Sequence, residues 1–322
     1  MKPIIDLPPV VFLLGKGGVG RSTAAATLGL YYATGRNEKV LLVQWSIQDS
    51  ISPFFDQPQC GHKHQQLLPN LSVMNYNADE AMKEYFVEHL NMGIFYKFIL
   101  ENQQVKKLIH AAPGLEELFF LGRLFWLVEL AEKERGYKFD RIIIDSPATG
   151  HGSALFGVAA TISKFKLSGP LVSETARVAR LLEDQTKVGT AIVTLPEELP
   201  VEETLEMIPK ITNDMGRPPL MILLNRSLSP LLKNGLLTEP TLSAKFTDKI
   251  ESTLTKEDQL TSQAIAADLS RRITFEKQLR TTIANDIPVI SIPDLMIPMP
   301  KAKKIAQIEM IAHQYLTNEL SN

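Results

Sequence analysis

The chain has 322 residues, of which 44% are hydrophobic and 22% are charged, and its formal net charge is −2 at pH 7. This composition excludes disorder as the main state, and the small net charge gives no electrostatic basis for nucleic acid as the main ligand. The N-terminus lacks the long apolar run of a secretion signal, and no run approaches the roughly 18 apolar residues of a spanning helix. We therefore expect a cytoplasmic protein without stable membrane insertion.

The strongest chemical motif lies between an apolar run at residues 10–14, predicted as a strand, and a helix predicted from residue 24. Glycines expose backbone N–H groups and a helix N-terminus adds partial positive charge, so this stretch predicts a cradle for nucleotide phosphates. The residues of the motif are Gly15, Lys16, Gly17, Gly18, Val19, Gly20, Arg21, Ser22 and Thr23.

The motif departs from the general phosphate-loop pattern at one position. In the pattern G-x-x-x-x-G-K-S/T the lysine contacts the β- and γ-phosphates and the hydroxyl ligates magnesium. Arg21 stands where the lysine is expected, and Ser22 supplies the hydroxyl. Because a planar guanidinium does not fill the same space as an ammonium, nucleotide binding can survive while hydrolysis is slowed.

The loop resembles the deviant sequence G-K-G-G-V-G-K-S/T of the ArsA-like anion-transporting and tail-anchored-protein-targeting ATPases, which are related to MinD and ParA. The resemblance implies that Lys16 reaches across a homodimer to the nucleotide of the other subunit. It also implies a first-switch aspartate after the second strand (residues 39–45), where this chain has Ser46. Serine cannot act as a carboxylate base, and Asp49 is either a substitute or a residue that caps the polar loop that follows.

A second motif runs from Arg141 to Gly152. An apolar strand ends at Asp145 and is followed by a loop with proline and two glycines, as in a magnesium-site carboxylate followed by a γ-phosphate sensor. It resembles the family's second switch, D-S/T-A/P-P/A-T-G-H. The resemblance implies that Asp145 holds magnesium through water and that the loop containing Thr149, Gly150 and His151 moves when the γ-phosphate leaves. We interpret His151 as a structural residue rather than a base.

The adenine base of the nucleotide is expected to bind at the end of a strand predicted at residues 219–226. By itself Asn225 reads as a turn residue, but the resemblance implies that its amide pairs with the adenine edge, which needs one donor and one acceptor. Arg226 follows it, and Pro293 begins the loop that lies near the base in relatives, after a final strand at residues 288–292.

Residues 78–135 have apolar residues at helical spacing and predict three or four inserted helices. The stretch at residues 119–128 is apolar nearly all round, so it is either core or a surface for a partner. In the targeting ATPases this region binds a client's transmembrane helix, and client binding is kept as a hypothesis. Further helices are predicted at residues 173–187, from residue 201, at 259–283 and at 301–316. The last is a packed terminal helix or a MinD-type membrane-surface helix.

The predicted fold is an α/β doubly wound, mostly parallel sheet of seven or eight strands: one P-loop ATPase domain at residues 1–322, with a helical subdomain at 78–135. The expected function is an ATP- and Mg²⁺-binding ATPase that acts as a dimeric switch on a client or partner. The alternative is a hydrolysis-impaired subunit of a paralogous ATPase, in a heterodimer. Cys60 is the single cysteine, which excludes the cysteine triad through which arsenite activates the arsenite pump.

Overall fold

The computed structural model describes residues 7–85, 87, 114–147, 156, 170–233, 255–283, 286–294, 309 and 311–312. The described strands form one eight-stranded sheet with the order β3-β4-β2-β5-β1-β6-β7-β8. Every neighbouring pair is parallel except β3 and β4. The strands are β1 (Val10–Leu14), β2 (Val40–Gln44), β3 (Gln65–Leu68), β4 (Leu71–Asn75), β5 (Arg141–Asp145), β6 (Val188–Thr194), β7 (Met221–Ser227) and β8 (Val289–Pro293). The predicted fold class is confirmed.

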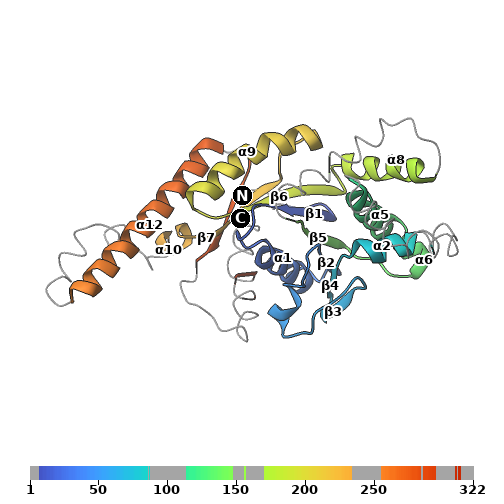
Figure 1. The fold of residues 1–322 in the computed structure, drawn as a ribbon, viewed down its shortest axis with the longest axis horizontal. Helices are drawn as coiled ribbons and strands as arrows, with labels where there is room; N and C mark the ends of the chain where they lie inside the picture. The colour runs from blue at the N-terminus through green and yellow to red at the C-terminus, as the bar shows by residue number, and fades with distance from the viewer. Residues whose placement is uncertain are drawn as a thin grey trace, which may run out of the picture.

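Helices cover both faces of this sheet (Figure 1). Their bounds are α1 (Arg21–Leu30), the π-helical turn η1 (Tyr31–Gly35), the 3-10 turn η2 (Ser52–Phe55), α2 (Ala78–Glu84), α5 (Leu115–Glu129), α6 (Ala131–Arg135), α8 (Pro170–Glu183), α9 (Glu198–Met215), α10 (Ser229–Lys233) and α12 (Lys256–Ile283). Residues 170–175 are described by their backbone only.

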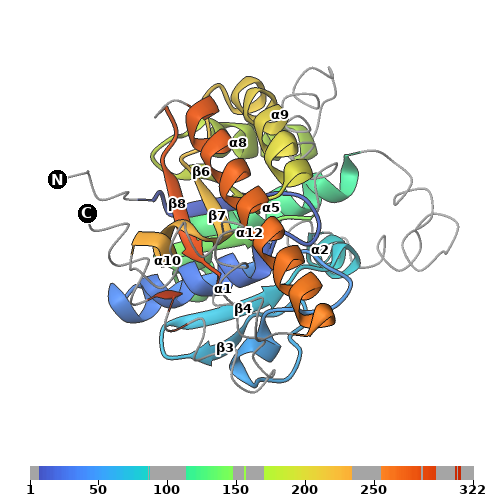
Figure 2. The same cartoon turned by 90° about the vertical axis from the view of Figure 1, so that its left-hand side faces the viewer.

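The alternation of side chains along β1 divides the core into two layers. Val10 and Phe12 pack with buried residues of α5, α8, α9 and α12, whereas Val11 and Leu13 pack with α1 and η1. All five residues of β1 are buried, as expected for a parallel strand covered on both faces. Figure 2 shows the sheet between α1 on one side and α9 on the other.

The carboxyl ends of the central strands meet at one edge of the sheet. Leu13 of β1 is level with Asp145 of β5, and Gln44 of β2 is level with the same aspartate. β1 lies between β5 and β6, and the order of the strands reverses at β1: β2 and β5 lie on one side of it and β6, β7 and β8 on the other. Ligands of open α/β sheets bind beyond such carboxyl ends. The predicted phosphate loop and the predicted magnesium carboxylate are therefore placed side by side.

Three sequence expectations need correction. The segment after β2 is predicted as a polar loop, but it contains η2 and the antiparallel strand β3. The sequence of β3, Gln-Gln-Leu-Leu, does not alternate, and pairing with β4 at the sheet edge supplies the order that propensity does not. Helix α9 begins at Glu198 instead of Val201, because Pro200 falls in its first turn, where proline is tolerated. Pro293 ends β8 and does not begin a loop.

The apolar stretch at residues 119–128 belongs to the core. Phe119, Phe120, Leu124 and Leu127 of α5 are buried among residues of the sheet and of α8. The structure describes α2, α5 and α6 between β4 and β5, and residues 88–113 lie outside the described part. The limits of a helical subdomain at residues 78–135 stay a prediction.

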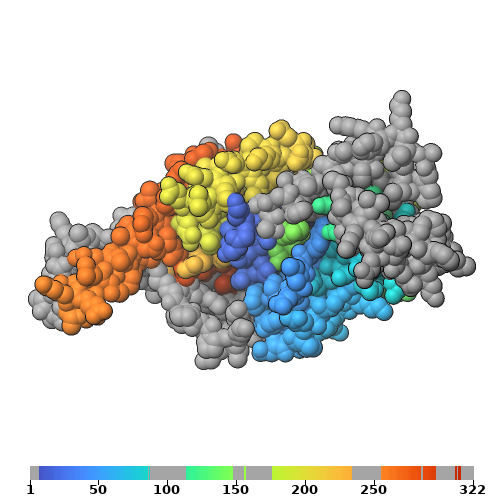
Figure 3. Space-filling model, viewed as in Figure 1, coloured from blue at the N-terminus to red at the C-terminus, as the bar shows by residue number. Residues whose placement is uncertain are grey.

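Helix α12 and the helix predicted at residues 301–316 can also be compared with the sequence predictions. Helix α12 is longer than expected, and its buried residues, Arg272, Glu276, Leu279 and Ile283, all lie in its second half. Its first half projects from the sheet (Figures 1 and 3). Of residues 301–316 only 309 and 311–312 are described, and Ile311 and Ala312 are buried in the core layer of α1, as a packed terminal helix requires. Within the described part of the chain, no helix combines the length and apolar character needed to span a membrane.

Candidate nucleotide-binding site

The loop between β1 and α1 has the backbone of an anion cradle. Gly15, Gly18 and Gly20 have φ angles of 151°, 87° and 89°, which residues with a Cβ rarely adopt. A Cβ on Gly15 would collide with the carbonyl oxygen of Val193, whereas one on Gly17 would meet nothing within 4 Å. Gly20 begins α1 without any side-chain cap, so the first N–H groups of this helix remain available to a ligand.

A pocket of 440 Å³ opens at this loop. It is formed by the loop, the first turn of α1 and the segment that leads into η2. Its lining residues are Lys16, Gly18, Gly20, Arg21, Ser22, Thr23, Ser50, Pro53 and Phe54. Six of the nine residues of the predicted motif therefore line one cavity, at the carboxyl edge of the sheet.

Ser22 and Asp145 form a close pair beside the pocket. The Ser22 hydroxyl donates to Asp145 Oδ2 at 2.5 Å, across 123 residues of sequence. Burial raises the pKa of Asp145 above its usual range, and the hydrogen bond from Ser22 and the charge of Arg21 oppose this rise. A buried carboxylate with a raised pKa gains from a nearby cation, because the cation stabilises its charged form.

The donor set of this pair fits magnesium, which prefers hydroxyl, carboxylate and water oxygens. Ser22 and Asp145 are the residues that would hold the ion, and the N–H groups of the loop suit the phosphates that accompany it. Bound magnesium would neutralise part of the phosphate charge. The chain's own task is then to hold the two oxygens in place, and the Ser22–Asp145 hydrogen bond does so before any ligand arrives.

Arg21 turns back onto the protein. Its Nε lies 3.3 Å from Asp145 Oδ1, and its Nη1 donates to the carbonyl oxygen of Gly15 and approaches that of Lys16 at 3.5 Å. The planar guanidinium thus connects the loop to the carboxylate, which a compact ammonium does not do in the same way. Within the described residues its Nη2 hydrogens make no hydrogen bond.

Lys16 forms an ion pair with Glu203 of α9. Both side chains are partly exposed, at 53% and 28%. Sequence reasoning missed Glu203 as a partner, because α9 is 187 residues away and no local pattern connects the two. In this structure Lys16 therefore pairs with a residue of its own chain, and its expected reach across a dimer stays a prediction.

Ser46 and Asp49 differ sharply in their surroundings. Ser46 is exposed, and its hydroxyl donates to the carbonyl oxygen of Gln48 at 2.7 Å. Asp49 is buried and accepts hydrogen bonds from the N–H groups of Ile51 and Cys60, at 2.9 Å and 2.8 Å. Burial alone raises the pKa of Asp49, but hydrogen bonds from Ser52, Cys60 and Gln44 outweigh it and hold the pKa at about 2. Asp49 therefore caps the loop in this structure, and the alternative of a substitute base stays a prediction.

The structure adds two residues that the sequence did not indicate, Gln44 and Ser50. The Ser50 hydroxyl lies 2.9 Å from Ser22 Oγ, and also 2.9 Å from Gln44 Oε1. A glutamine at the end of an otherwise apolar strand is the one signal in the sequence that could have identified this connection. Ser50 itself stands in a polar loop without any distinguishing pattern.

Asn225 contacts the phosphate loop. Its Nδ2 donates to the carbonyl oxygen of Val19 at 2.9 Å, and a Cβ on Gly20 would collide with the same amide. Its Oδ1 accepts from the N–H of Arg226 at 3.0 Å. The amide thus supports the loop from the end of β7, and its predicted pairing with adenine stays a prediction, as do the roles of Arg226 and Pro293 near the base.

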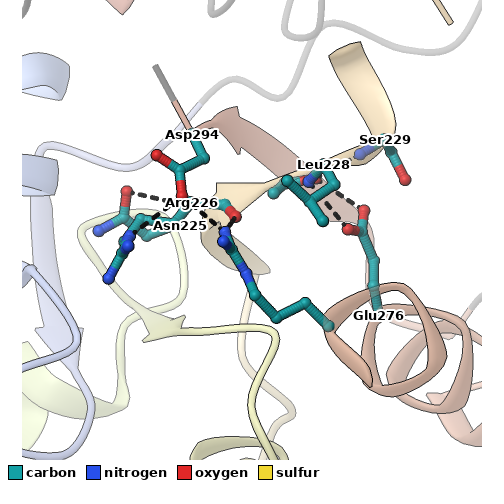
Figure 4. Close-up of polar contacts among 8 residues, drawn as sticks. Asn225, Arg226, Leu228, Ser229, Glu276 and Asp294 are labelled. Carbon is teal, nitrogen blue, oxygen red and sulfur yellow. Dashed lines mark hydrogen bonds and ion pairs between the residues drawn. The ribbon is translucent and has the colours of Figure 1, made fainter. Parts of the chain in front are cut away.

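Figure 4 shows a polar network at the ends of β7 and β8. Arg226 has a φ of 55° where the register of β7 and β8 shifts, so its backbone turns out of the strand. Arg272 of α12 donates to the Arg226 carbonyl oxygen at 2.6 Å and to Asp294 Oδ2 at 2.7 Å. Glu276 accepts from the Ser227 hydroxyl at 2.7 Å and from the Leu228 N–H at 3.2 Å. Helix α12 is held to the sheet by these contacts.

The remaining candidates are placed as follows. Thr149, Gly150 and His151 of the second switch lie outside the described residues. Cys60 is buried, and burial together with its hydrogen bond to Asp49 raises the pKa of the thiol to about 12. A thiol that stays protonated is a poor ligand for soft metals and metalloids. Within the described part of the chain, no group of three or more histidine, cysteine or acidic side chains is arranged to hold a metal ion.

The parallel sheet, the glycine cradle at the end of β1 and the Ser22–Asp145 pair define the class of P-loop nucleotide-binding α/β proteins. The family model described as anion-transporting ATPase matches residues 9–168. The ATPase BagA of Mycobacterium tuberculosis is 28% identical over 293 residues, covering 88% of this chain and 85% of the relative. These matches show that the chain is similar to the anion-transporting ATPase family.

Two further relatives match shorter parts. A putative arsenical pump-driving ATPase 2 of Aquifex aeolicus is 27% identical over 231 residues, covering 62% of this chain and 74% of the relative. The ATPase GET3 of Komagataella phaffii is 29% identical over 162 residues, covering 48% of this chain and 45% of the relative. All of these relatives carry the name ATPase, which agrees with a nucleotide site at the described pocket.

Proposed function

We propose that this chain is a cytoplasmic Mg-ATP-dependent ATPase that acts as a dimeric switch on a protein partner. The observation that carries the proposal is the Ser22–Asp145 pair beside a glycine cradle with open helix N–H groups. Phosphoryl transfer needs positioning and charge stabilisation more than it needs covalent chemistry from the protein. A preformed cradle and a preformed pair of magnesium ligands supply both.

Each residue of the phosphate end has a part in this proposal. The backbone from Gly17 to Gly20 and the first N–H groups of α1 bind the phosphates, with Thr23 in the same turn. Ser22 ligates magnesium, and Asp145 orients the water around the ion. Arg21 contacts phosphate through Nη2 while its other donors hold the loop. Lys16 leaves Glu203 and neutralises phosphate charge across the dimer.

A second function is favoured by the surroundings of Arg21, Ser46 and Asp49. The guanidinium of Arg21 hydrogen-bonds to Gly15 and Asp145. Ser46 cannot act as a carboxylate base, and the Asp49 carboxylate accepts hydrogen bonds from the loop that it caps. A chain with these features can bind ATP and fail to cleave it. It would then be a hydrolysis-impaired subunit that pairs with a paralogous ATPase.

Two observations limit the partner. The apolar stripe of α5 is core, so the hypothesis of client binding on this stripe loses its support. The single cysteine is a buried, protonated thiol, which argues against arsenite as a ligand. A protein partner that reads the opening and closing of the nucleotide face is the remaining class.

The test is single-turnover ATP cleavage by the purified chain, beside Lys16→Ala and Asp145→Ala. The switch ATPase predicts bound ATP and slow cleavage that both substitutions reduce by at least tenfold. The mass of the assembly in light scattering should double with Mg-ATP and stay that of a monomer in Lys16→Ala. ATP that is bound but stays intact until a paralogous subunit is added favours the impaired subunit. Absence of ATP binding contradicts both functions.

A further inference from the structure

A chain of polar contacts leads from the Ser22–Asp145 pair into the loop that follows β2. Ser22 gives its one hydroxyl hydrogen to Asp145, so it acts as an acceptor toward Ser50, whose Oγ lies 2.9 Å away. Gln44 Oε1 accepts from the N–H of Ser50 at 2.9 Å and is a second possible acceptor for the Ser50 hydroxyl, also at 2.9 Å. The phosphate end of α1 is thereby connected to the carboxyl end of β2.

The orientation of the Gln44 amide is determined by its buried neighbour. Gln44 Nε2 lies 2.5 Å from Asp49 Oδ1, and both side chains are buried. An ionised carboxylate only accepts hydrogen bonds, so the amide nitrogen has to face Asp49 and the amide oxygen has to face Ser50. Asp49 is in turn fixed by the N–H groups of Ile51 and Cys60. The place of the exposed Ser50 hydroxyl is thus set by residues inside the protein.

Ser50 has one hydroxyl hydrogen and two acceptors at equal distance, Ser22 Oγ and Gln44 Oε1. The hydrogen can turn from one to the other without leaving a donor unpaired, because Gln44 keeps the Ser50 N–H in either case. The Ser50 hydroxyl can therefore reorient at a small cost in free energy when the hydrogen bonding of Ser22 changes. The Ser46 hydroxyl lies 2.7 Å from the carbonyl oxygen of Gln48 and 3.5 Å from Asn75 Oδ1, and Ser46 does not line the pocket.

We propose that Ser50, held by Gln44 and Asp49, is the positioning residue that couples the Ser22–Asp145 pair to the loop after β2. This inference rests on the proposed function, because it concerns how the chain responds to Mg-ATP. Its consequence is that magnesium-dependent ATP affinity depends on the Ser50 hydroxyl.

The loop has a built-in reporter of this coupling. Trp45 follows Gln44 directly, and its ring stacks on Phe120 of α5 with centroids 5.0–5.1 Å from those of Tyr76 and Phe120. A shift of Gln44 therefore reaches the helices between β4 and β5 through aromatic contacts. The chain has two tryptophans, so a Trp126→Phe background leaves Trp45 as the only indole.

The experiment measures binding of an ATP analogue with a non-cleavable β–γ bond, in magnesium and in EDTA. Loss of one hydrogen bond corresponds to about 0.5–1.5 kcal/mol, or about 2- to 10-fold in affinity. Ser50→Ala should lower affinity by this factor in magnesium and leave it unchanged in EDTA, and Ser50→Thr should restore it. Ser46→Ala is the matched control in the same loop and should behave as wild type.

Trp45 emission gives the second readout. In the Trp126→Phe background it should change on addition of Mg-ATP analogue, and this change should be lost in Ser50→Ala at saturating ligand. Wild-type binding that depends on magnesium but is equal in Ser50→Ala, with an unaltered Trp45 response, overturns this inference and leaves the proposed function intact. If the wild type binds no Mg-ATP analogue at all, the proposed function fails and the inference falls with it.

Discussion

The two ends of the candidate site are built in opposite ways. At the phosphate end, glycines and the uncapped start of α1 leave backbone N–H groups open to a ligand. At the ends of β7 and β8, the charged side chains are paired within the protein. Asp294 forms ion pairs with Arg226 and Arg272, and Glu276 accepts a hydrogen bond from the Ser227 hydroxyl. One end is arranged to receive a ligand and the other to fasten α12. Substitutions at the two ends should therefore separate binding from stability.

The largest effect is expected at Gly15, where the loop meets β6. Gly15→Ala places a Cβ against the Val193 carbonyl in a backbone conformation that alanine rarely adopts. Strain of this kind amounts to about 3 kcal/mol, so we expect a matching loss in the free energy of unfolding and loss of ATP binding. Urea unfolding and ATP titration measure the two. Gly17→Ala, which meets nothing within 4 Å, should keep wild-type stability; equal losses in both variants would contradict the geometry.

The opposite end should show loss of stability without loss of phosphate binding. Arg272→Met removes the buried guanidinium that holds Asp294 and the Arg226 carbonyl, and we expect a loss of about 2–3 kcal/mol in urea unfolding. The affinity for inorganic triphosphate should stay within about threefold. Arg271→Met is the matched control, because Arg271 is 70% exposed and pairs only at the surface. Weakened triphosphate binding at unchanged stability would break the comparison.

A smaller effect, which depends on pH, is expected at the loop cap. The pKa of Asp49 is about 2 in the folded protein against an ordinary 3.8, so its contribution to stability is complete above about pH 4 and is lost as the pH falls through 2. Asp49→Asn should cost about 1 kcal/mol at pH 7, after allowance for solvent screening, and the difference from wild type should shrink toward pH 2. Asp56→Asn, in the same loop, is the control. A constant difference across this range would show that ionisation has no part.

The smallest effect is expected at the ion pair of Lys16. Glu203→Gln releases the lysine and removes a negative charge beside the pocket, so ATP affinity should rise about two- to threefold at low salt. Raising the ionic strength should abolish the gain, because exposed charges are screened. Glu202→Gln makes the same change of charge on the neighbouring residue. If both variants gain equally, the pair with Lys16 has no specific effect.

The parts of the fold that the sequence predicted are those whose pattern lies within one short stretch of the chain. The strand and glycine pattern around Gly15 and the apolar strand ending at Asp145 predicted the sheet correctly, because both are short stretches with strong constraints. The structure also brings Ser22 and Asp145 together, and their binding of magnesium stays a prediction. Strand β3 was missed because edge pairing and not side-chain pattern orders Gln65–Leu68. Gln44, Ser50 and Glu203 were missed for a related reason. Their contacts join distant segments, or turn within a loop, and no spacing rule reports either.

The central claim is that Ser22 and Asp145 form the magnesium-dependent part of an ATP site in this chain. Equilibrium ATP binding with and without magnesium, in wild type and Asp145→Asn, tests it directly. Asparagine keeps the shape of the side chain and removes its charge, so ATP should bind at least tenfold more weakly in magnesium and equally in EDTA. Equal affinities of the two proteins in magnesium would contradict the claim.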